Sequence, residues 1–390
     1  MNYNFDEFYD RRGTQCIKHD GVKEFLGSAD LIPMWVADMD FRTPPFVMED
    51  LRKRLEHEVL GYPVRAESYF SSLIGWTERN HDWILKRDWI SFSPGVVPAV
   101  NMAVLAYTQP GDSIITQPPV YFPFYTAVKD HGRKLVYNPL QLKDGRLCMD
   151  FDDLEQKAAE GAKMIILSSP HNPGGSVWTR EELGKLAEIC LRHNILMLSD
   201  EIHCDLVYKP FKHIPLASLS EEISARTITT VAPSKTFNLS GLSTASVIIS
   251  DDFLRKKFTQ VLNHLHIGGG NIIGNIASES AYTHGDEWAG QLMDYLGKNL
   301  DFMEEFLGRN IPQISMLRPE ATFLVWLDCR ELRMTDDELK EFFITKAKLG
   351  LNPGIQFNPG GEGFMRMNIG CTKAVLEKAL LQLQQAVSAL

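Results

Sequence analysis

The chain has 390 residues, which is too long for one ordinary hydrophobic core. Of these residues 44% are hydrophobic and 23% are charged, a composition typical of a globular protein. Its formal charge of -10 and isoelectric point near 5.6 argue against general affinity for nucleic acid or anionic membranes. We therefore expect no nucleic-acid partner, no membrane partner and a small molecule as the ligand.

The first residues carry Asp6 and Glu7 where a secretory signal would have basic and then apolar residues, and the apolar runs elsewhere are too short to span a bilayer. These features predict a cytoplasmic protein. The six cysteines show no spacing of the zinc-site type. We expect them to be reduced, and we expect no metal.

Between Asp88 and Ser250, short β-rich runs alternate with helical stretches. Seven runs are predicted to be strands, at residues 89–93, 113–116, 134–137, 164–167, 195–198, 227–231 and 246–249. Thr179 and Glu182 form a capping-box pattern that begins a helix reaching His193. The alternation predicts an α/β fold with a mostly parallel seven-stranded sheet, covered by helices on both faces, whose ligands bind at the carboxyl ends of the strands.

After Asp251 the pattern changes to long helices followed by a mixed section. Helices are predicted near 287–307, 336–348 and 373–389, with strands near 322–327 and 364–368. This section predicts a smaller α+β domain. We place the large domain at residues 48–285 and the small domain at residues 1–47 and 286–390.

Two of the predicted strand ends could hold a flat, phosphorylated ligand. The first strand ends in Pro94-Gly95 and leads into a helix over 99–107, where free backbone N–H groups would bind an anion and Gly95 would let a phosphate approach closely. Taken alone, this is also the pattern of an ordinary turn. Tyr121 follows the next strand and could stack on a planar ring, although buried aromatic residues are common at a sheet edge.

An amide, an acid and an amine follow three later strands in order: Asn172, Asp200 and Lys235. Separately, Asp200 could cap a helix and Lys235 could be a solvated surface lysine. Together they supply the groups that pyridoxal phosphate needs: an amine for a Schiff base, an acid for the ring nitrogen and an amide for the ring oxygen.

Arg366 lies in a predicted late strand with apolar residues at alternate positions. Its guanidinium fork suits the carboxylate of an amino acid, while a structural salt bridge is the alternative.

Asn172-Pro-Gly, Ser-Asp200-Glu and Ser-Lys235-Thr-Phe, at intervals of 28 and 35 residues, resemble the fold-type I aminotransferase superfamily along essentially the whole chain. The segments Pro33–Phe41, Asp200–Asp205 and Lys235–Leu239 are similar to the MalY/PatB group of cystathionine β-lyases. The resemblance implies the pyridoxal-phosphate transferase fold of type I, with the cofactor held as a Schiff base by Lys235 as the catalytic residue.

The resemblance also implies a set of binding residues. The cofactor-binding residues would be Gly95, Val96, Val97, Tyr121, Asn172, Asp200, His203, Ser234 and Lys235, with Tyr62 reaching in from the neighbouring subunit of a homodimer. Arg366 would bind the substrate carboxylate with help from the backbone near Val36 and Ala37.

Two positions depart from the broad transaminase pattern. His203 stands where many transaminases have a tyrosine, and Ser243 stands where they carry a phosphate-binding arginine. Both resemble the β-lyase group and predict β-elimination of a sulfur amino acid such as cystathionine. An aminotransferase that uses a 2-oxo acid acceptor is the alternative, and a regulatory protein that retains the fold is an alternative of another class.

Overall fold

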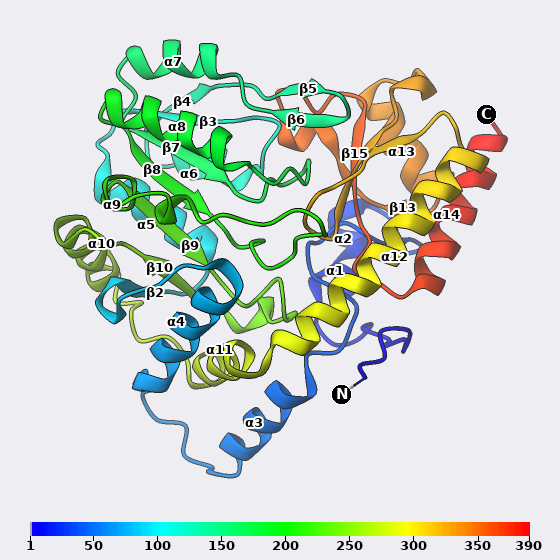
Figure 1. The fold of residues 1–390 in the computed structure, drawn as a ribbon. Helices are drawn as coiled ribbons and strands as arrows, with labels where there is room; N and C mark the ends of the chain where they lie inside the picture. Colours follow the sequence, from blue (N-terminus) through cyan, green and yellow to red (C-terminus); the bar gives the residue numbers. More distant parts are fainter. Residues whose placement is uncertain (1) are drawn as a thin grey trace.

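A computed structural model describes residues 2–390, and its larger part is built on one seven-stranded sheet (Figure 1). The strand order is β2 (Ile90–Ser93), β10 (Ala245–Ile248), β9 (Thr227–Val231), β8 (Leu196–Asp200), β7 (Met164–Ser168), β3 (Ser113–Thr116) and β4 (Lys134–Tyr137). β10 is antiparallel to both of its neighbours, and the pairs from β9 to β4 are parallel. The predicted α/β fold with a mostly parallel seven-stranded sheet is confirmed.

Helices cover both faces of this sheet, as its hydrophobic strands require. On β7, Met164 and Ile166 enter one hydrophobic core, while Ile165 and Leu167 enter another. The first core contains residues of α5 (Val96–Tyr107), α6 (Pro123–Lys129) and α10 (Asp252–His264), and the second contains residues of α7 (Phe151–Ala159) and α8 (Arg180–Arg192). The alternation follows from the two-residue period of a strand.

The helix predicted after Thr179 is α8, and its capping box is present. The Thr179 hydroxyl accepts from the backbone of Glu182, and the Glu182 carboxylate accepts from the backbone of Thr179. These reciprocal bonds satisfy two backbone donors that would otherwise lack partners, which fixes where the helix begins.

The smaller part has a four-stranded antiparallel sheet in the order β11 (Ser315–Leu317), β12 (Leu324–Asp328), β15 (Phe364–Asn368) and β14 (Asn352–Pro353). The strand predicted from residue 322 begins at Leu324, because Thr322 has a φ of 74° that interrupts extended backbone. The helix predicted to reach residue 348 is α13 (Asp336–Thr345), which ends earlier because the chain turns there into β13 (Leu349–Gly350). α14 (Lys373–Ser388) covers this part at the carboxyl end.

The amino-terminal residues join the smaller part through β1 (Ile32–Pro33), which pairs with β13. α12 (Asp286–Asn310) follows α11 (Ile272–His284) and runs from the neighbourhood of α3 (Pro45–Leu55) and α4 (Glu67–His81) across to the small sheet (Figure 1). The remaining helices and strands are α1 (Ile17–Asp20), α2 (Val22–Leu26), α9 (Glu221–Ala225), β5 (Gln141–Lys143) and β6 (Arg146–Cys148). The domain boundaries at 47/48 and 285/286 stay a prediction.

Across residues 2–390, no helix combines the length and apolar character needed to cross a bilayer.

Candidate active site

A cavity of about 230 Å³ lies where β7, β8 and β9 end, at the carboxyl edge of the large sheet. The predicted residues that line it are Ala37, Gly95, Val96, Val97, Tyr121, Asn172, Asp200, His203, Ser234 and Lys235. Parallel strands deliver their carboxyl ends to one edge, and this is why Asn172, Asp200 and Lys235 meet there although they are far apart in the sequence.

Lys235 lies in the turn that follows β9 and points its amine at the opposite wall of the cavity. Its Nζ donates a hydrogen bond of 2.6 Å to the carbonyl oxygen of Ala37. Burial lowers the pKa of Lys235 to about 8, although Asp38 partly opposes the shift. A lowered pKa makes the neutral, nucleophilic amine accessible near physiological pH.

Asp200 is the last residue of β8 rather than the residue after the strand, because β8 continues two residues beyond its predicted end. Its Oδ1 accepts from the backbone N–H of Ile202 at 3.2 Å. Burial raises the pKa of Asp200 to about 7, with Lys235 acting in the other direction. A cationic partner in the cavity would favour the carboxylate form.

Asn172 and Arg366 meet at the side of the cavity nearest the small sheet. Arg366 is 4% exposed, and its Nη1 donates to Oδ1 of Asn172 at 3.0 Å. Its Nη2 donates to the Trp35 carbonyl at 3.0 Å and to Oδ1 of Asn352 at 2.7 Å, while its buried Nε has no partner.

Arg366 takes part in none of the ion pairs among residues 2–390. The alternative of a structural salt bridge is therefore wrong. Burial lowers the pKa of Arg366 to about 10, so the group remains a cation at neutral pH. A buried guanidinium without a carboxylate partner is suited to receive an anionic ligand.

The amino terminus of α5 forms the opposite end of the cavity. Gly95 precedes the helix with a φ of 144°, a backbone conformation that side chains disfavour. Val96 and Val97, in the first turn, line the cavity, and first-turn N–H groups lack partners within the helix. Ser234, Ser243 and Thr244 also line it, and the Thr244 hydroxyl is buried without a hydrogen-bond partner. Together these groups can bind a phosphate.

Tyr121 and His203 complete the wall between these two ends. Tyr121 packs against Phe122 and Phe124, with ring centroids 5.5 and 5.9 Å away. Burial, with the positive charges of Lys235 and Arg366, lowers the pKa of His203 to about 3, so its ring is neutral. The buried Nδ1 of His203 has no hydrogen-bond partner.

Three predicted residues do not line this cavity: Arg366, which borders it through its hydrogen bond to Asn172, and Tyr62 and Val36. Tyr62 lies at a separate hollow of about 290 Å³ together with Arg54 and Asn275, and its side chain is fully exposed at 106%. Val36 lies one residue before Ala37, and its carbonyl accepts from Nδ2 of Asn368 at 2.6 Å. The structure therefore brings every predicted site residue except Tyr62 to the cavity or to its immediate border.

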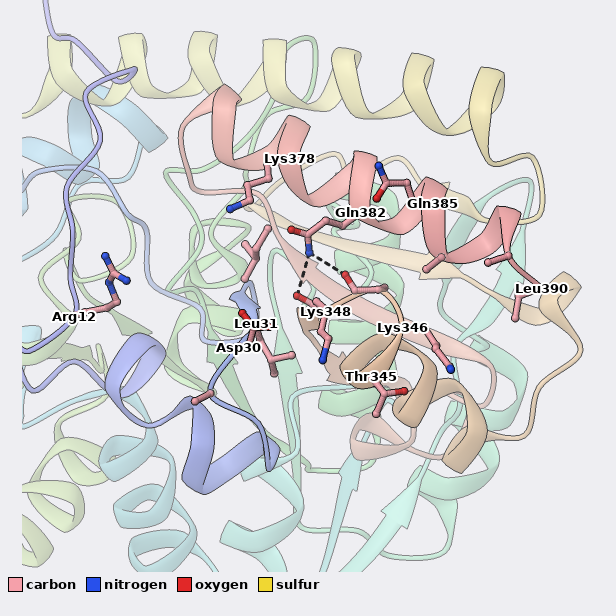
Figure 2. Close-up of a pocket in the computed structure, with 15 residues that line it drawn as sticks. Arg12, Asp30, Leu31, Thr345, Lys346, Lys348, Lys378, Gln382, Gln385 and Leu390 are labelled. Carbon is pink, nitrogen blue, oxygen red and sulfur yellow. Dashed lines mark hydrogen bonds between the residues drawn. The ribbon is translucent and has the colours of Figure 1, made fainter.

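A larger groove of about 710 Å³ lies on the smaller part of the chain (Figure 2). It is lined by Lys346, Lys348 and Lys378 and by Gln382, whose Nε2 donates to the Ala347 carbonyl at 3.0 Å. None of the predicted site residues lines this groove, so its size does not identify it as the reactive site.

Several residues of the site had no signal in the sequence. Asn352 holds Arg366 from β14, and the Trp35 carbonyl holds it from the amino-terminal segment. Thr244 adds a hydroxyl to the cavity wall. Asn352 and Thr244 belong to no recognisable pattern. Trp35 lies in the segment Pro33–Phe41, but it acts through its backbone carbonyl, and the sequence does not show that this carbonyl contacts Arg366.

The residues present fit pyridoxal phosphate. Buried polar atoms without hydrogen-bond partners belong to Thr244 and His203, which line the cavity, and to Arg366, which borders it through Asn172. Between them stand an amine of lowered pKa and a carboxyl group at a strand end. The fold and the site thus define an α/β enzyme of the pyridoxal-phosphate type, with a lysine anchor at the carboxyl edge of the sheet.

Comparison with known proteins agrees with this class. A model of the aminotransferase class I and II family matches residues 29–383, and the chain belongs to that family. Cystathionine beta-lyase PatB of Bacillus subtilis is 44% identical, over 99% of this chain and 100% of the relative. Cystalysin from Treponema denticola superposes with a TM-score of 0.96 at 35% identity, covering 100% of both chains. A C-S lyase from Staphylococcus hominis gives a TM-score of 0.93 at 34% identity, covering 99% of this chain and 98% of the other.

Proposed function

We propose that this protein is a pyridoxal-phosphate-dependent carbon-sulfur β-lyase that acts on cystathionine or a related sulfur amino acid and releases a thiol (homocysteine from cystathionine), pyruvate and ammonia. The observation that carries the proposal is the full-length similarity to cystathionine beta-lyase PatB, joined to a cavity with Lys235, Asp200, Asn172 and an unpaired Arg366.

The cofactor would be held by residues already placed around the cavity. Lys235 would hold its aldehyde carbon, and the first turn of α5 with Ser234 and Thr244 would hold its phosphate. Asn172 and Tyr121 would fix its ring. When bound, pyridoxal phosphate supplies the sink for the electron pair left at the substrate Cα.

The residues of this chain then have distinct tasks. Arg366 binds the substrate carboxylate and so orients the Cα proton toward Lys235. The substrate amine would replace Lys235 on the aldehyde carbon, and the amine of Lys235 that is set free would then remove this proton as a general base. Asp200 holds the proton on the ring nitrogen. The substrate C–S bond breaks, the thiolate leaves from Cβ and takes up a proton, and the remaining enamine hydrolyses to pyruvate and ammonia.

The test is to supply cystathionine without any 2-oxo acid and to measure pyruvate and free thiol. The proposal predicts equal amounts of both, and Lys235→Ala as a control should abolish their release. Amino transfer that requires an added 2-oxo acid, with no thiol released, would establish the aminotransferase instead. Absence of both reactions in protein that shows cofactor absorbance would favour a regulatory role.

We also propose that the protein works as a homodimer in the cytoplasm. Val59, Leu60, Tyr62 and Val64 are 67%, 61%, 106% and 87% exposed, an apolar stretch that a second copy would cover. In that arrangement Tyr62 would reach the phosphate of the other subunit. Sedimentation of wild type and of Tyr62→Ala, together with titration of cofactor binding, tests this. If the wild type sediments as a monomer and Tyr62→Ala binds the cofactor as tightly as the wild type does, the proposed homodimer is overturned.

A further inference from the structure

A cluster of buried polar side chains lies next to the turn that carries Lys235, and none of its residues lines the cavity. Its centre is Asp205, whose side chain is 5% exposed and accepts hydrogen bonds through both oxygens. We propose that Asp205 is a positioning residue that fixes the reactive amine of Lys235 through Thr236. The inference rests on the proposed function, in which Lys235 carries the chemistry.

The first set of contacts ties Asp205 to helix α4. Its Oδ1 accepts from Nε1 of Trp76 at 2.9 Å and from Nε2 of His81 at 2.8 Å. Both donors lie on α4, a helix of 15 residues. Two fixed donors from one helix leave little freedom for this carboxylate, so Asp205 is a rigid reference point.

The second contact joins Asp205 to Thr236, the residue next to the reactive lysine. Oδ2 of Asp205 accepts from the hydroxyl of Thr236 at 2.8 Å, and Thr236 is fully buried. Thr236 follows Lys235 directly in the chain, so this bond fixes the backbone from which the lysine side chain starts. Asn238 fixes the far end of the same turn through hydrogen bonds to the carbonyls of Met39 and Phe41, both 2.9 Å.

A similar set of contacts holds Glu201, the residue that follows Asp200. The His81 ring meets the His213 ring edge-on at 5.5 Å, and Nε2 of His213 lies 2.9 Å from Oε2 of Glu201. Glu201 follows Asp200 in the chain and also accepts from the Ser199 hydroxyl at 2.9 Å. The residue after Lys235 and the residue after Asp200 are thus both anchored in one buried network that does not touch the cavity.

A metal site is the competing explanation for this cluster, because ligand atoms of His81, Cys204 and Asp205 lie within 4.8 Å of one another. Burial raises the pKa of the Cys204 thiol well above its usual value, so the group stays protonated and is a poor ligand. The two oxygens of Asp205 are already used by donors from Trp76, His81 and Thr236. The cluster is therefore a hydrogen-bond network around one carboxylate.

The test compares two replacements of Thr236 in the cofactor-loaded protein. Thr236→Val keeps the shape and removes the hydroxyl, whereas Thr236→Ser keeps the hydroxyl. Thr229→Val is the matched control, since Thr229 is an equally buried threonine on β9 whose hydroxyl has no partner. We expect Thr236→Val to lower kcat about tenfold with KM little changed, because small displacements of a reacting group are costly. It should also move the midpoint of the pH titration of the cofactor's visible absorbance, and Thr236→Ser should restore both values.

Each outcome decides the matter. Rates and titration midpoints for Thr236→Val equal to those of Thr229→Val would overturn the proposal, as would a change in absorbance or activity on adding zinc that disappears in Cys204→Ala. If Thr236→Val does not fold, Trp76→Phe removes one donor from the same carboxylate, and unchanged values there would overturn it. The absorbance titration reports on Lys235 whether or not a thiol is released, so failure of the lyase function stays distinguishable.

Discussion

The two walls of the cavity are held in place by different forces. The wall at the sheet edge carries Lys235 and Asp200, whose own side chains take part in none of the ion pairs among residues 2–390, and burial shifts the pKa values of both. The wall that faces it is the segment around Ala37, and buried ion pairs fasten it. The difference separates chemistry from recognition: the titrating groups with shifted pKa values stand at or just after strand ends, while ion pairs hold the loop that we propose to meet the substrate.

The charged wall has its own geometry. The side chain of Lys18 is 1% exposed. Its Nζ lies 2.9 Å from Oδ2 of Asp40 and donates to the carbonyl oxygen of Asp38 at 3.2 Å. Arg11 pairs with Oδ2 of Asp38 and with Oδ1 of Asp40, each at 2.7 Å. Since Asp38 follows Ala37, these contacts determine where the hydrogen-bond acceptor of Lys235 lies.

The strongest test of the sheet-edge wall is Lys235→Ala. We expect turnover to fall by about 10³-fold or more, because in the proposed function the same amine is both the cofactor anchor and the general base. The visible absorbance of the Schiff base should disappear as well. Lys163→Ala, at an exposed lysine, is the control and should change neither. Retained absorbance in Lys235→Ala would show that another amine holds the cofactor.

Asp200→Asn should have the next largest effect on catalysis. The amide keeps the shape but cannot balance a protonated ring nitrogen, so we expect turnover to fall by about 10²-fold. Cofactor should still bind, which absorbance can check, and Asp144→Asn on the exposed turn between β5 and β6 is the control. Full activity in Asp200→Asn would remove Asp200 from the mechanism.

The contrast between the walls also explains how far the sequence can be interpreted. Strand ends are predictable because a run of apolar residues shows where a strand stops, and parallel strands bring Asn172, Asp200 and Lys235 to one edge. The β9 bounds, Thr227–Val231, agree with the predicted strand residue for residue. The charged wall was not predictable, because Lys18 and Asp40 are 22 residues apart and no sequence pattern shows that the chain brings them together.

Lys18→Met tests the charged wall directly. Removing one partner of a buried ion pair leaves carboxylates uncompensated, so the free energy of unfolding should fall by about 3 to 5 kcal/mol. Turnover should fall less in Lys18→Met than in Lys235→Ala or Asp200→Asn. The substitution should raise KM more than it lowers kcat. Urea unfolding and steady-state kinetics measure both, with Lys53→Met on exposed α3 as the control. A fall in kcat alone would place Lys18 with the reactive wall instead.

The smallest expected effect is a loss of stability at acid pH, which depends on the pKa of Asp40. Burial by itself raises the pKa of Asp40, but the charge of Lys18 and hydrogen bonds from His19, Lys18 and Arg11 lower it by more, so that it lies well below its usual value. A carboxyl group with a depressed pKa in the folded state stabilises the protein above the unfolded pKa of about 3.9, and this contribution is lost as the pH falls through the folded pKa.

The charged wall should therefore weaken in acid. We expect the free energy of unfolding, from urea titrations at a series of pH values, to fall below about pH 4, and this fall should be shallower in Asp40→Asn, which has no carboxyl group to protonate. The substrate-free protein is suitable for the measurement, because these ion pairs join only residues of the chain itself. Parallel curves for wild type and Asp40→Asn would mean that ion pairs do not hold this wall, and the contrast with the sheet edge would fail.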